Sequence, residues 1–316
     1  MDVSSTTLAR TSATTGTNPQ GARTNPHTTS TNAPDVERRL TELRNVVLLR
    51  RLRPVTLLVA EQWEEDLRAA CLLSKYSLIP LSIKQGAHAS IPQILRTSTP
   101  LNRDSTETLP HIFLDIIQSK FNKGRYLGPF SPEELKLEIG PFQSSPLSLI
   151  PKSGKPGKYC LIQNVSFPHT NTPYPSINSF LELDDFPCTW GMFTTISTLI
   201  RKLPTGAQAA VRDISEAYWI IPLHESQWAR TVVRIAKKPD LFALNMCNSF
   251  GCTTAGGLFG MFGDALADLL RAKGIGPVLK WVDDFIFFRI PGDCIPAYNQ
   301  NRECDCKVVD RNGGLI

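Results

Sequence analysis

The chain has 316 residues, of which 41% are apolar and 20% are charged. These proportions are close to those of ordinary globular proteins, which excludes a fibrous or wholly disordered chain. The net charge of +5 permits a polyanionic partner without requiring one. No stretch approaches the roughly 18 uncharged apolar residues that span a bilayer, and the start lacks the apolar core of a secretory signal. We therefore expect an intracellular protein of the cytoplasm or nucleus that is not secreted and has no membrane partner.

The eight cysteines contain no Cys-x-x-Cys pair, so neither a disulfide framework nor a common zinc module is predicted. Reduced, unpaired thiols are the expected state of an intracellular chain. The spacing of Cys294, Cys304 and Cys306 leaves a metal site near the C-terminus as an alternative.

Residues 1–36 are rich in Thr and Ser and poor in apolar side chains. This composition buries too little apolar surface to offset the entropy lost on ordering, so we expect a disordered tail. Residues 37–110 then form a helical, basic region that ends in a connector. Its first helix, from about Val36 to Pro54, carries many arginines, which either contact nucleic acid or form a solvated face.

The rest of this second region is predicted from its helix signals. A second helix is expected from about Val55 to Leu73. A connector that contains Pro and Ser then extends to about Pro110.

Residues 111–190 begin with an amphipathic helix over 111–123. A second helix should start at Ser131, where a hydroxyl cap precedes Pro132 and two glutamates. Beyond Gly140 the pattern changes to strands. The apolar runs 147–151 and 159–165 flank a turn-rich segment and predict a β-hairpin, whose tip carries Lys152, Lys155 and Lys158.

Residues 191–290 contain further strands and one helix, and residues 291–316 form a short tail. A strand should end at Asp213, and two more are expected over 228–235 and 241–246. The small-residue loop 251–257 opens a helix over about 258–272, and residues 277–288 form a hairpin with Asp283 and Asp284 at its turn. This order predicts an α+β fold, in which helices pack on one face of an antiparallel sheet.

Three aspartates in this last region suggest a metal site. Asp283 and Asp284 are adjacent, so their charges repel and raise each other's pKa unless a cation lies between them. A solvent-exposed Asp-Asp turn is the ordinary alternative. Asp213 also ends an apolar strand, and antiparallel pairing of that strand with the hairpin would bring all three together. Carboxylates suit Mg²⁺, with Mn²⁺ as a substitute, and two ions would support nucleotidyl transfer.

Several sequence blocks in residues 125–290 resemble the fingers and palm of a reverse transcriptase from a retroelement of the long-terminal-repeat or tyrosine-recombinase type. The segment 213–218 is similar to the first palm motif, an aspartate followed by four residues and an aromatic. Residues 250–259 resemble the glycine loop that enters a helix, and 281–284 resemble the Tyr-Val-Asp-Asp box. Segments 128–130, 145–147 and 158–164 are similar to the fingers.

The resemblance implies an RNA-directed DNA polymerase of a retrotransposon, a nucleotidyltransferase that adds deoxynucleotides to a primer. Its partners would be an RNA or DNA template with its primer, and deoxynucleoside triphosphates. Two Mg²⁺ ions would be its cofactors. The resemblance implies roles for seven residues. Asp213 and Asp283 would be the principal metal ligands, supported by the Asp284 carboxylate and the Ile214 carbonyl.

The other three would contact the nucleotide. Tyr218 would be the steric gate against a ribose 2′-hydroxyl, Lys152 would contact the triphosphate, and Gly251 would let the backbone approach the nucleotide closely.

The sequence also departs from the family pattern. Cys160 stands where the family has an arginine, and a thiol cannot supply a permanent bidentate charge to phosphate. Asn164 replaces an aspartate, and Gly256 replaces a proline. From the short tail beyond Arg289 we expect a truncated domain without the rest of the palm, the thumb or an RNase H domain, and a partner chain that supplies the thumb is left open. These departures predict little or no primer extension by the chain alone.

Two other functions compete with the polymerase. The first is an inactive retroelement remnant with a palm-like fold and at most weak RNA binding. The second is an RNA-dependent RNA polymerase. That function is disfavoured because Val282 stands where those enzymes have glycine, and because Tyr218 would obstruct a ribonucleotide.

Overall fold

The computed structural model describes residue 38 and residues 56–169 and 175–300. It has an α+β fold in which every named strand pairs antiparallel with its neighbours, and the predicted fold class is confirmed. The helices are α2 (Ala60–Ala69), α3 (Leu78–Gln85), α4 (Ser105–Thr108), α5 (Pro110–Asn122), α6 (Pro132–Ile139), α7 (Phe193–Lys202) and α8 (Ala255–Ala272). The strands are β1 (Tyr126–Phe130), β2 (Leu147–Pro151), β3 (Tyr159–Gln163), β4 (Gln208–Asp213), β5 (Val232–Lys237), β6 (Asp240–Asn245), β7 (Val278–Trp281) and β8 (Asp284–Arg289).

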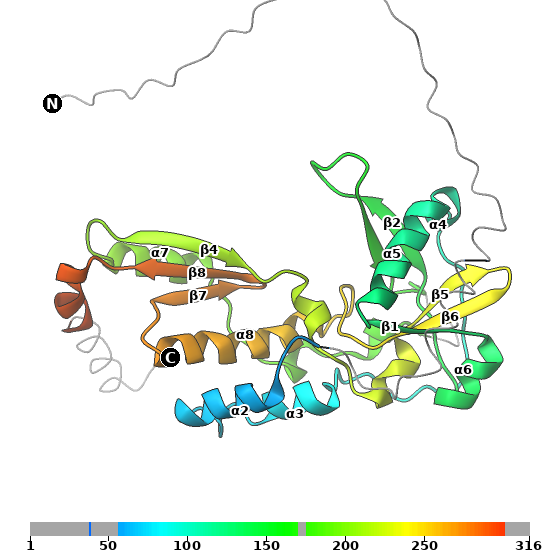
Figure 1. The fold of residues 1–316 in the computed structure, drawn as a ribbon, viewed down its shortest axis with the longest axis horizontal. Helices are drawn as coiled ribbons and strands as arrows, with labels where there is room; N and C mark the ends of the chain where they lie inside the picture. The colour runs from blue at the N-terminus through cyan, green and yellow to red at the C-terminus, as the bar shows by residue number, and fades with distance from the viewer. Residues whose placement is uncertain (1–37, 39–55, 170–174, 301–316) are drawn as a thin grey trace, which may run out of the picture.

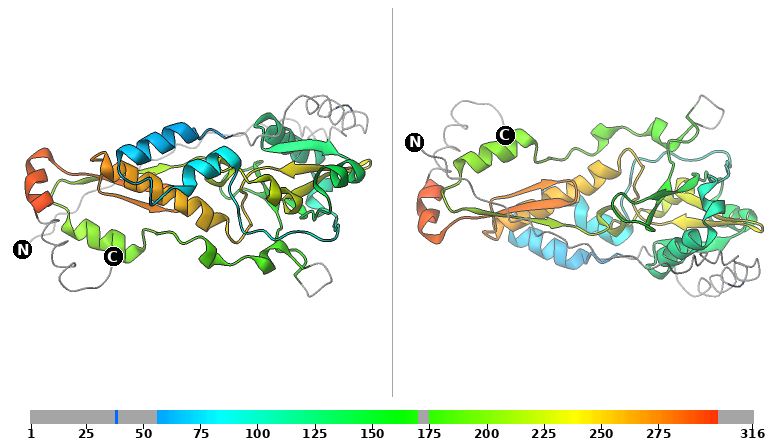
Figure 2. Two further views of the ribbon diagram at one scale, coloured as in Figure 1. Left: turned by 90° about the horizontal axis from the view of Figure 1, so that it is seen from below. Right: turned by 90° about the horizontal axis from the view of Figure 1, so that it is seen from above.

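The strands form three separate sheets along an elongated molecule (Figures 1 and 2). At one end the sheet β4-β8-β7 lies on α8, and α2 and α3 lie on the other side of that helix (Figure 1). At the other end the sheet β1-β6-β5 and the hairpin β2-β3 are grouped with α4, α5 and α6 (Figure 1). The largest core cluster joins both ends, since it contains residues of α2, α3, β6 and α8.

Side-chain alternation explains how the sheet β4-β8-β7 packs on α8. Val278 of β7 and Phe285 of β8 are buried against Ala267 of the helix. Residues on one face of a strand recur every second position, so Phe287 of β8 packs on this face as well, and the residues between these positions face away from α8. β4 is exposed along its whole length and forms one edge of this sheet.

Residues 56–110 contain more structure than a connector. The second predicted helix is shorter than expected and corresponds to α2, while α3 and α4 lie within the segment expected to be a connector. Leu67 of α2 and Ile79 of α3 are almost completely buried in the main core. The signals of α3 were obscured because Pro80 falls inside its first turn, where proline costs no hydrogen bond.

Other predicted elements are confirmed, with changed ends. Ser131 caps α6 through a complete capping box with Glu134. Trp228 lies in a 3₁₀ turn over 225–230, so the following strand starts at Val232 and not at 228. α8 starts at Ala255, three residues before the expected start at 258. A Cβ on its Gly257 would lie 2.8 Å from Phe186, and one on Gly260 would lie 2.4 Å from Cys188.

Several predictions fall outside the described residues: the Thr- and Ser-rich tail, the basic helix that ends at Pro54, and the thiols of Cys304 and Cys306. Among the helices that the structure describes, none has the length and apolar character needed to cross a membrane.

Candidate functional site

The three predicted aspartates lie at one end of the sheet β4-β8-β7. β4 ends at Asp213, whose direct antiparallel partner on β8 is Asp284. The next residue, Ile214, donates its backbone N–H to the carbonyl of Asp283 at 2.9 Å. The predicted pairing of the first strand with the hairpin is therefore observed, and it brings distant parts of the chain together.

The carboxylates at this sheet end lack protein partners. Asp213 is exposed, and Asp283 and Asp284 are half-buried. Within the described residues, none of the three carboxylates is paired with a cation or accepts a hydrogen bond. In the same part of the chain no group of three or more His, Cys, Asp or Glu is arranged so that it could hold a metal ion. The oxygen ligands are thus available, but they are not gathered into a complete ligand set.

Tyr218 lies between the aspartates and the glycine loop. Its ring packs against Phe250, with 4.3 Å between centroids, and against Phe259 at 5.7 Å. Burial raises the pKa of the Tyr218 hydroxyl, and the nearby Asp283 carboxylate raises it further. A Cβ on Gly256 would lie 3.5 Å from this hydroxyl, in ordinary contact. Tyr218 therefore contacts the glycine loop and the start of α8, and its hydroxyl lies within reach of the Asp283 charge.

Gly251 has a structural role that the sequence did not indicate. Its φ is +103°, and a Cβ there would lie 2.7 Å from the backbone carbonyl oxygen of Gln163 at the end of β3. Asn178 fixes the same loop, because its amide nitrogen donates to the Gly251 carbonyl at 2.8 Å and its amide oxygen accepts from the Thr253 N–H at 2.9 Å. The close approach seen here is to the protein's own backbone.

The backbone of Ile214 has partners on both sides. Its N–H binds the Asp283 carbonyl, and its own carbonyl accepts the Ala217 N–H at 3.2 Å. A carbonyl oxygen has two lone pairs, so this bond leaves room for a second contact.

Lys152 stands apart from the aspartates. It lies in the turn of the β2-β3 hairpin, where its N–H donates to the Lys158 carbonyl at 2.8 Å. Lys152, Lys155 and Lys158 are all exposed, and no hydrogen bond or ion pair between described residues joins Lys152 to the three aspartates. The hairpin tip projects from the body of the molecule (Figure 1). Cys160 is half-buried on β3, opposite Ile150.

A cluster of salt bridges around Glu216 was not predicted from the sequence. Both guanidinium nitrogens of Arg125 bind the Glu216 carboxylate, at 2.8 and 2.7 Å, and Lys123 binds it at 2.7 Å. Glu216 has a left-handed backbone with φ +57°. Its hydrogen bonds to Arg125 and Lys123 lower the pKa of its carboxyl from 4.5 to about 2. The cluster ties the segment between α5 and β1 to the segment between Asp213 and Tyr218.

This lowered pKa predicts an acid-sensitive contribution to stability. A carboxyl whose pKa is lower in the folded state stabilises the fold above its unfolded pKa, and the effect is lost as the pH falls through the folded value. We expect Glu216→Gln to lower the melting temperature at pH 5 to 7, with a gap from the parent that narrows from pH 4.5 towards pH 2. Glu107→Gln, which breaks the exposed pair with Lys237, is the control and should have little effect at any pH. A gap independent of pH would contradict the assignment.

Comparison with known proteins gives a likeness in structure alone. No protein-family model matches the sequence, and no curated protein matches it. The foamy viral protease-reverse transcriptase in complex with an RNA/DNA hybrid is similar, with 15% identity and a TM-score of 0.44 over 87% of this chain and 31% of that chain. The native prototype foamy virus protease-reverse transcriptase has 14% identity and a TM-score of 0.42 over 83% and 33%. A dRH form of the foamy viral protein with double-stranded DNA has 15% identity and a TM-score of 0.43 over 85% and 41%. The chain thus spans less than half of each of these proteins.

Proposed function

We propose that the chain is the RNA-directed DNA polymerase domain of a retrotransposon, which adds deoxynucleotides to a primer on an RNA or DNA template. The observation that carries this proposal is the pairing of β4 with β8. It places Asp213 opposite Asp284 and bonds Ile214 to Asp283, so the carboxylates of two sequence motifs lie at the same sheet end. The motifs have the types and order of a reverse transcriptase, and the register supports their joint use.

The aspartates suit Mg²⁺ because they are hard oxygen ligands with no cationic partner in the described residues. Mg²⁺ usually takes one or two protein carboxylates and completes its shell with water and substrate phosphates. A gathered set of three carboxylates is therefore not needed before the nucleotide binds. Asp213 and Asp283 would hold the two ions, with Asp284 and the Ile214 carbonyl in support, and Mn²⁺ would substitute. When bound, the ions would activate the primer hydroxyl and stabilise the charge of the leaving pyrophosphate.

The other residues of the proposal bind and select the nucleotide. The ring of Tyr218 packs against Phe250 and Phe259. Held there, it would fill the space that a ribose 2′-hydroxyl needs. The loop at Gly251 is fixed by β3 and Asn178 and would line the nucleotide. Lys152 on the projecting hairpin would reach the triphosphate when that hairpin closes over it.

The role of Tyr218 predicts a change in sugar selectivity. Tyr218→Ala should reduce the preference for a deoxynucleoside over a ribonucleoside triphosphate by roughly tenfold or more, since it removes the clash that rejects the ribose. Tyr218→Phe keeps the ring and should keep the preference. Affinities for the two nucleotides with Mg²⁺ measure this ratio. An equal loss of affinity for both in Tyr218→Ala would show that the ring only holds the fold.

The proposed function is tested by Mg²⁺-dependent binding of a deoxynucleoside triphosphate to the full chain, followed by primer extension on an RNA template. Binding should require the metal and should disappear on chelation, while extension by the chain alone should be weak. Absence of metal-dependent binding would refute the polymerase.

The second candidate is an inactive retroelement remnant that binds RNA at most weakly. Two observations favour it: Cys160 supplies no charge to a phosphate, and the described carboxylates are not gathered around a metal position. RNA binding that is indifferent to Mg²⁺, without nucleotide binding, is the result expected of such a remnant.

A further inference from the structure

A buried lysine directly precedes the Trp281–Asp284 turn. Lys280 lies on β7, and its side chain is 3% exposed although the strand is otherwise apolar. Alternation along β7 points Lys280 to the same side as the buried Val278, towards α8. A charge in this position is costly unless it is paired and hydrogen-bonded.

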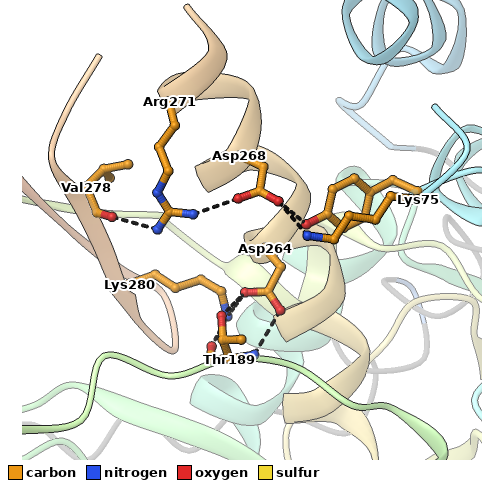
Figure 3. Close-up of polar contacts among 8 residues, drawn as sticks. Lys75, Thr189, Asp264, Asp268, Arg271, Val278 and Lys280 are labelled. Carbon is orange, nitrogen blue, oxygen red and sulfur yellow. Dashed lines mark hydrogen bonds and ion pairs between the residues drawn. The ribbon is translucent and has the colours of Figure 1, made fainter. Parts of the chain in front are cut away.

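The Lys280 ammonium is shared by two neighbouring segments (Figure 3). It donates to the Thr189 carbonyl at 2.5 Å and forms an ion pair with Asp264 of α8 at 3.2 Å. Asp264 in turn accepts the Thr189 N–H at 2.8 Å and the Thr189 hydroxyl at 2.5 Å. The three residues thus close a small network that joins β7, α8 and the segment before α7.

The surroundings of Lys280 are fitted to its side chain. A Cβ on Gly263 would lie 2.8 Å from Cδ of Lys280, and the ammonium lies 4.1 Å from the ring centroid of Trp190. The backbone is held as well, because the Lys280 carbonyl accepts the Gly191 N–H at 2.6 Å. Two residues earlier on β7, the Val278 carbonyl accepts from Arg271 of α8 at 2.8 Å (Figure 3).

The turn that follows is strained. Val282 has φ +51°, a left-handed conformation that a β-branched residue rarely adopts. Such residues persist only where the surrounding structure fixes them. Here the turn is fixed at both ends: Lys280 and its partners hold the end of β7, and Ile214 holds the carbonyl of Asp283.

We propose that Lys280 is a positioning residue that fixes the Trp281–Asp284 turn against Asp213. This inference rests on the proposed function, because the position of the turn matters only if its aspartates bind a metal. A buried ion pair stabilises a fold no better than well-packed apolar residues do, whereas it can specify one arrangement. A leucine or methionine at position 280 would bury as much surface without selecting the place where β7 ends.

The test compares Lys280→Met with the parent chain in two measurements. Methionine keeps the packing against Gly263 and removes the ammonium. The first measurement is ¹⁹F NMR of the chain labelled with 5-fluorotryptophan, in which Trp281→Phe and Trp190→Phe assign two of the five tryptophans. The second is Mn²⁺ affinity. We expect the Trp281 signal to shift or broaden, and Mn²⁺ affinity to fall about tenfold or more, as happens when groups that orient a metal ligand are removed.

Lys273→Met is the matched control, since it breaks the more exposed Lys273–Asp66 pair just beyond the end of α8 and should change neither measurement. An unchanged Trp281 signal in folded Lys280→Met would overturn the inference. A parent that binds no Mn²⁺ while Lys280→Met still moves Trp281 would refute the proposed function and leave the positioning role standing. If Lys280→Met does not fold, Asp264→Asn takes its place in both measurements, with the same expected results. If neither variant folds, Lys280 stabilises the whole fold, and the inference that it positions only this turn is wrong.

Discussion

Replacing Gly251 with alanine is expected to lower the free energy of unfolding by about 2–5 kcal/mol. Two effects add. The φ of +103° is strained for any residue with a Cβ, and that Cβ would lie 2.7 Å from the Gln163 carbonyl oxygen. The oxygen belongs to the backbone of β3, so it cannot rotate aside as a side chain would. The loop would have to move, and its bonds to Asn178 would break.

Gly154→Ala separates strain from steric overlap. Gly154 lies in the β2-β3 turn with φ +66°, and a Cβ there would meet nothing within 4 Å. We expect it to cost about 1 kcal/mol, from the left-handed backbone alone. Urea denaturation of both variants and the parent measures the difference. If the two variants lose the same stability, the approach of Gly251 to β3 does not constrain the loop.

Local signals predicted much of the fold. The capping box at Ser131 and the two hairpins follow from residues close in sequence, where cap and turn chemistry determine structure. The pairing of β4 with β8 is long-range, but it too could be predicted, because β4 ends at Asp213 and β8 begins at Asp284, and neighbouring carboxylates favour a shared cation. Its register, with Asp213 opposite Asp284, agrees with that expectation.

The remaining features depend on contacts that no local pattern encodes. Arg125 and Glu216 meet through the packing of α5 and β1 against the segment after β4, so neither residue signals the other. Lys280 is recognisable in the sequence as a single charge within an apolar strand, but its partner Asp264 lies on another element, so the pair itself could not be predicted. The arrangement of carboxylate oxygens is also beyond prediction from register, because register fixes backbone positions and not side-chain torsions.

Asp283→Asn should separate metal binding from folding. The substitution keeps the side-chain shape and removes one of three neighbouring negative charges, none of which has a cationic partner in the described residues. Without metal, relief of repulsion should leave the melting temperature unchanged or slightly raised. With metal the order should reverse: a ligand that binds only the folded state stabilises it by about 2.7 kcal/mol at a hundred times its dissociation constant. The parent should gain this increment with Mg²⁺, and Asp283→Asn should gain little.

A second adjacent aspartate pair provides the control for this experiment. Asp184 and Asp185 lie in an exposed 3₁₀ turn, outside the β4-β8 strand pair. Asp184→Asn removes the same charge from the same kind of dipeptide, so any general effect of net charge on Mg²⁺ binding would appear in it too. We expect its metal-induced rise in melting temperature to equal that of the parent. Equal losses in Asp184→Asn and Asp283→Asn would mean that Mg²⁺ acts through diffuse charge, and the strand register at Asp213 and Asp284 would then have no bearing on Mg²⁺ binding.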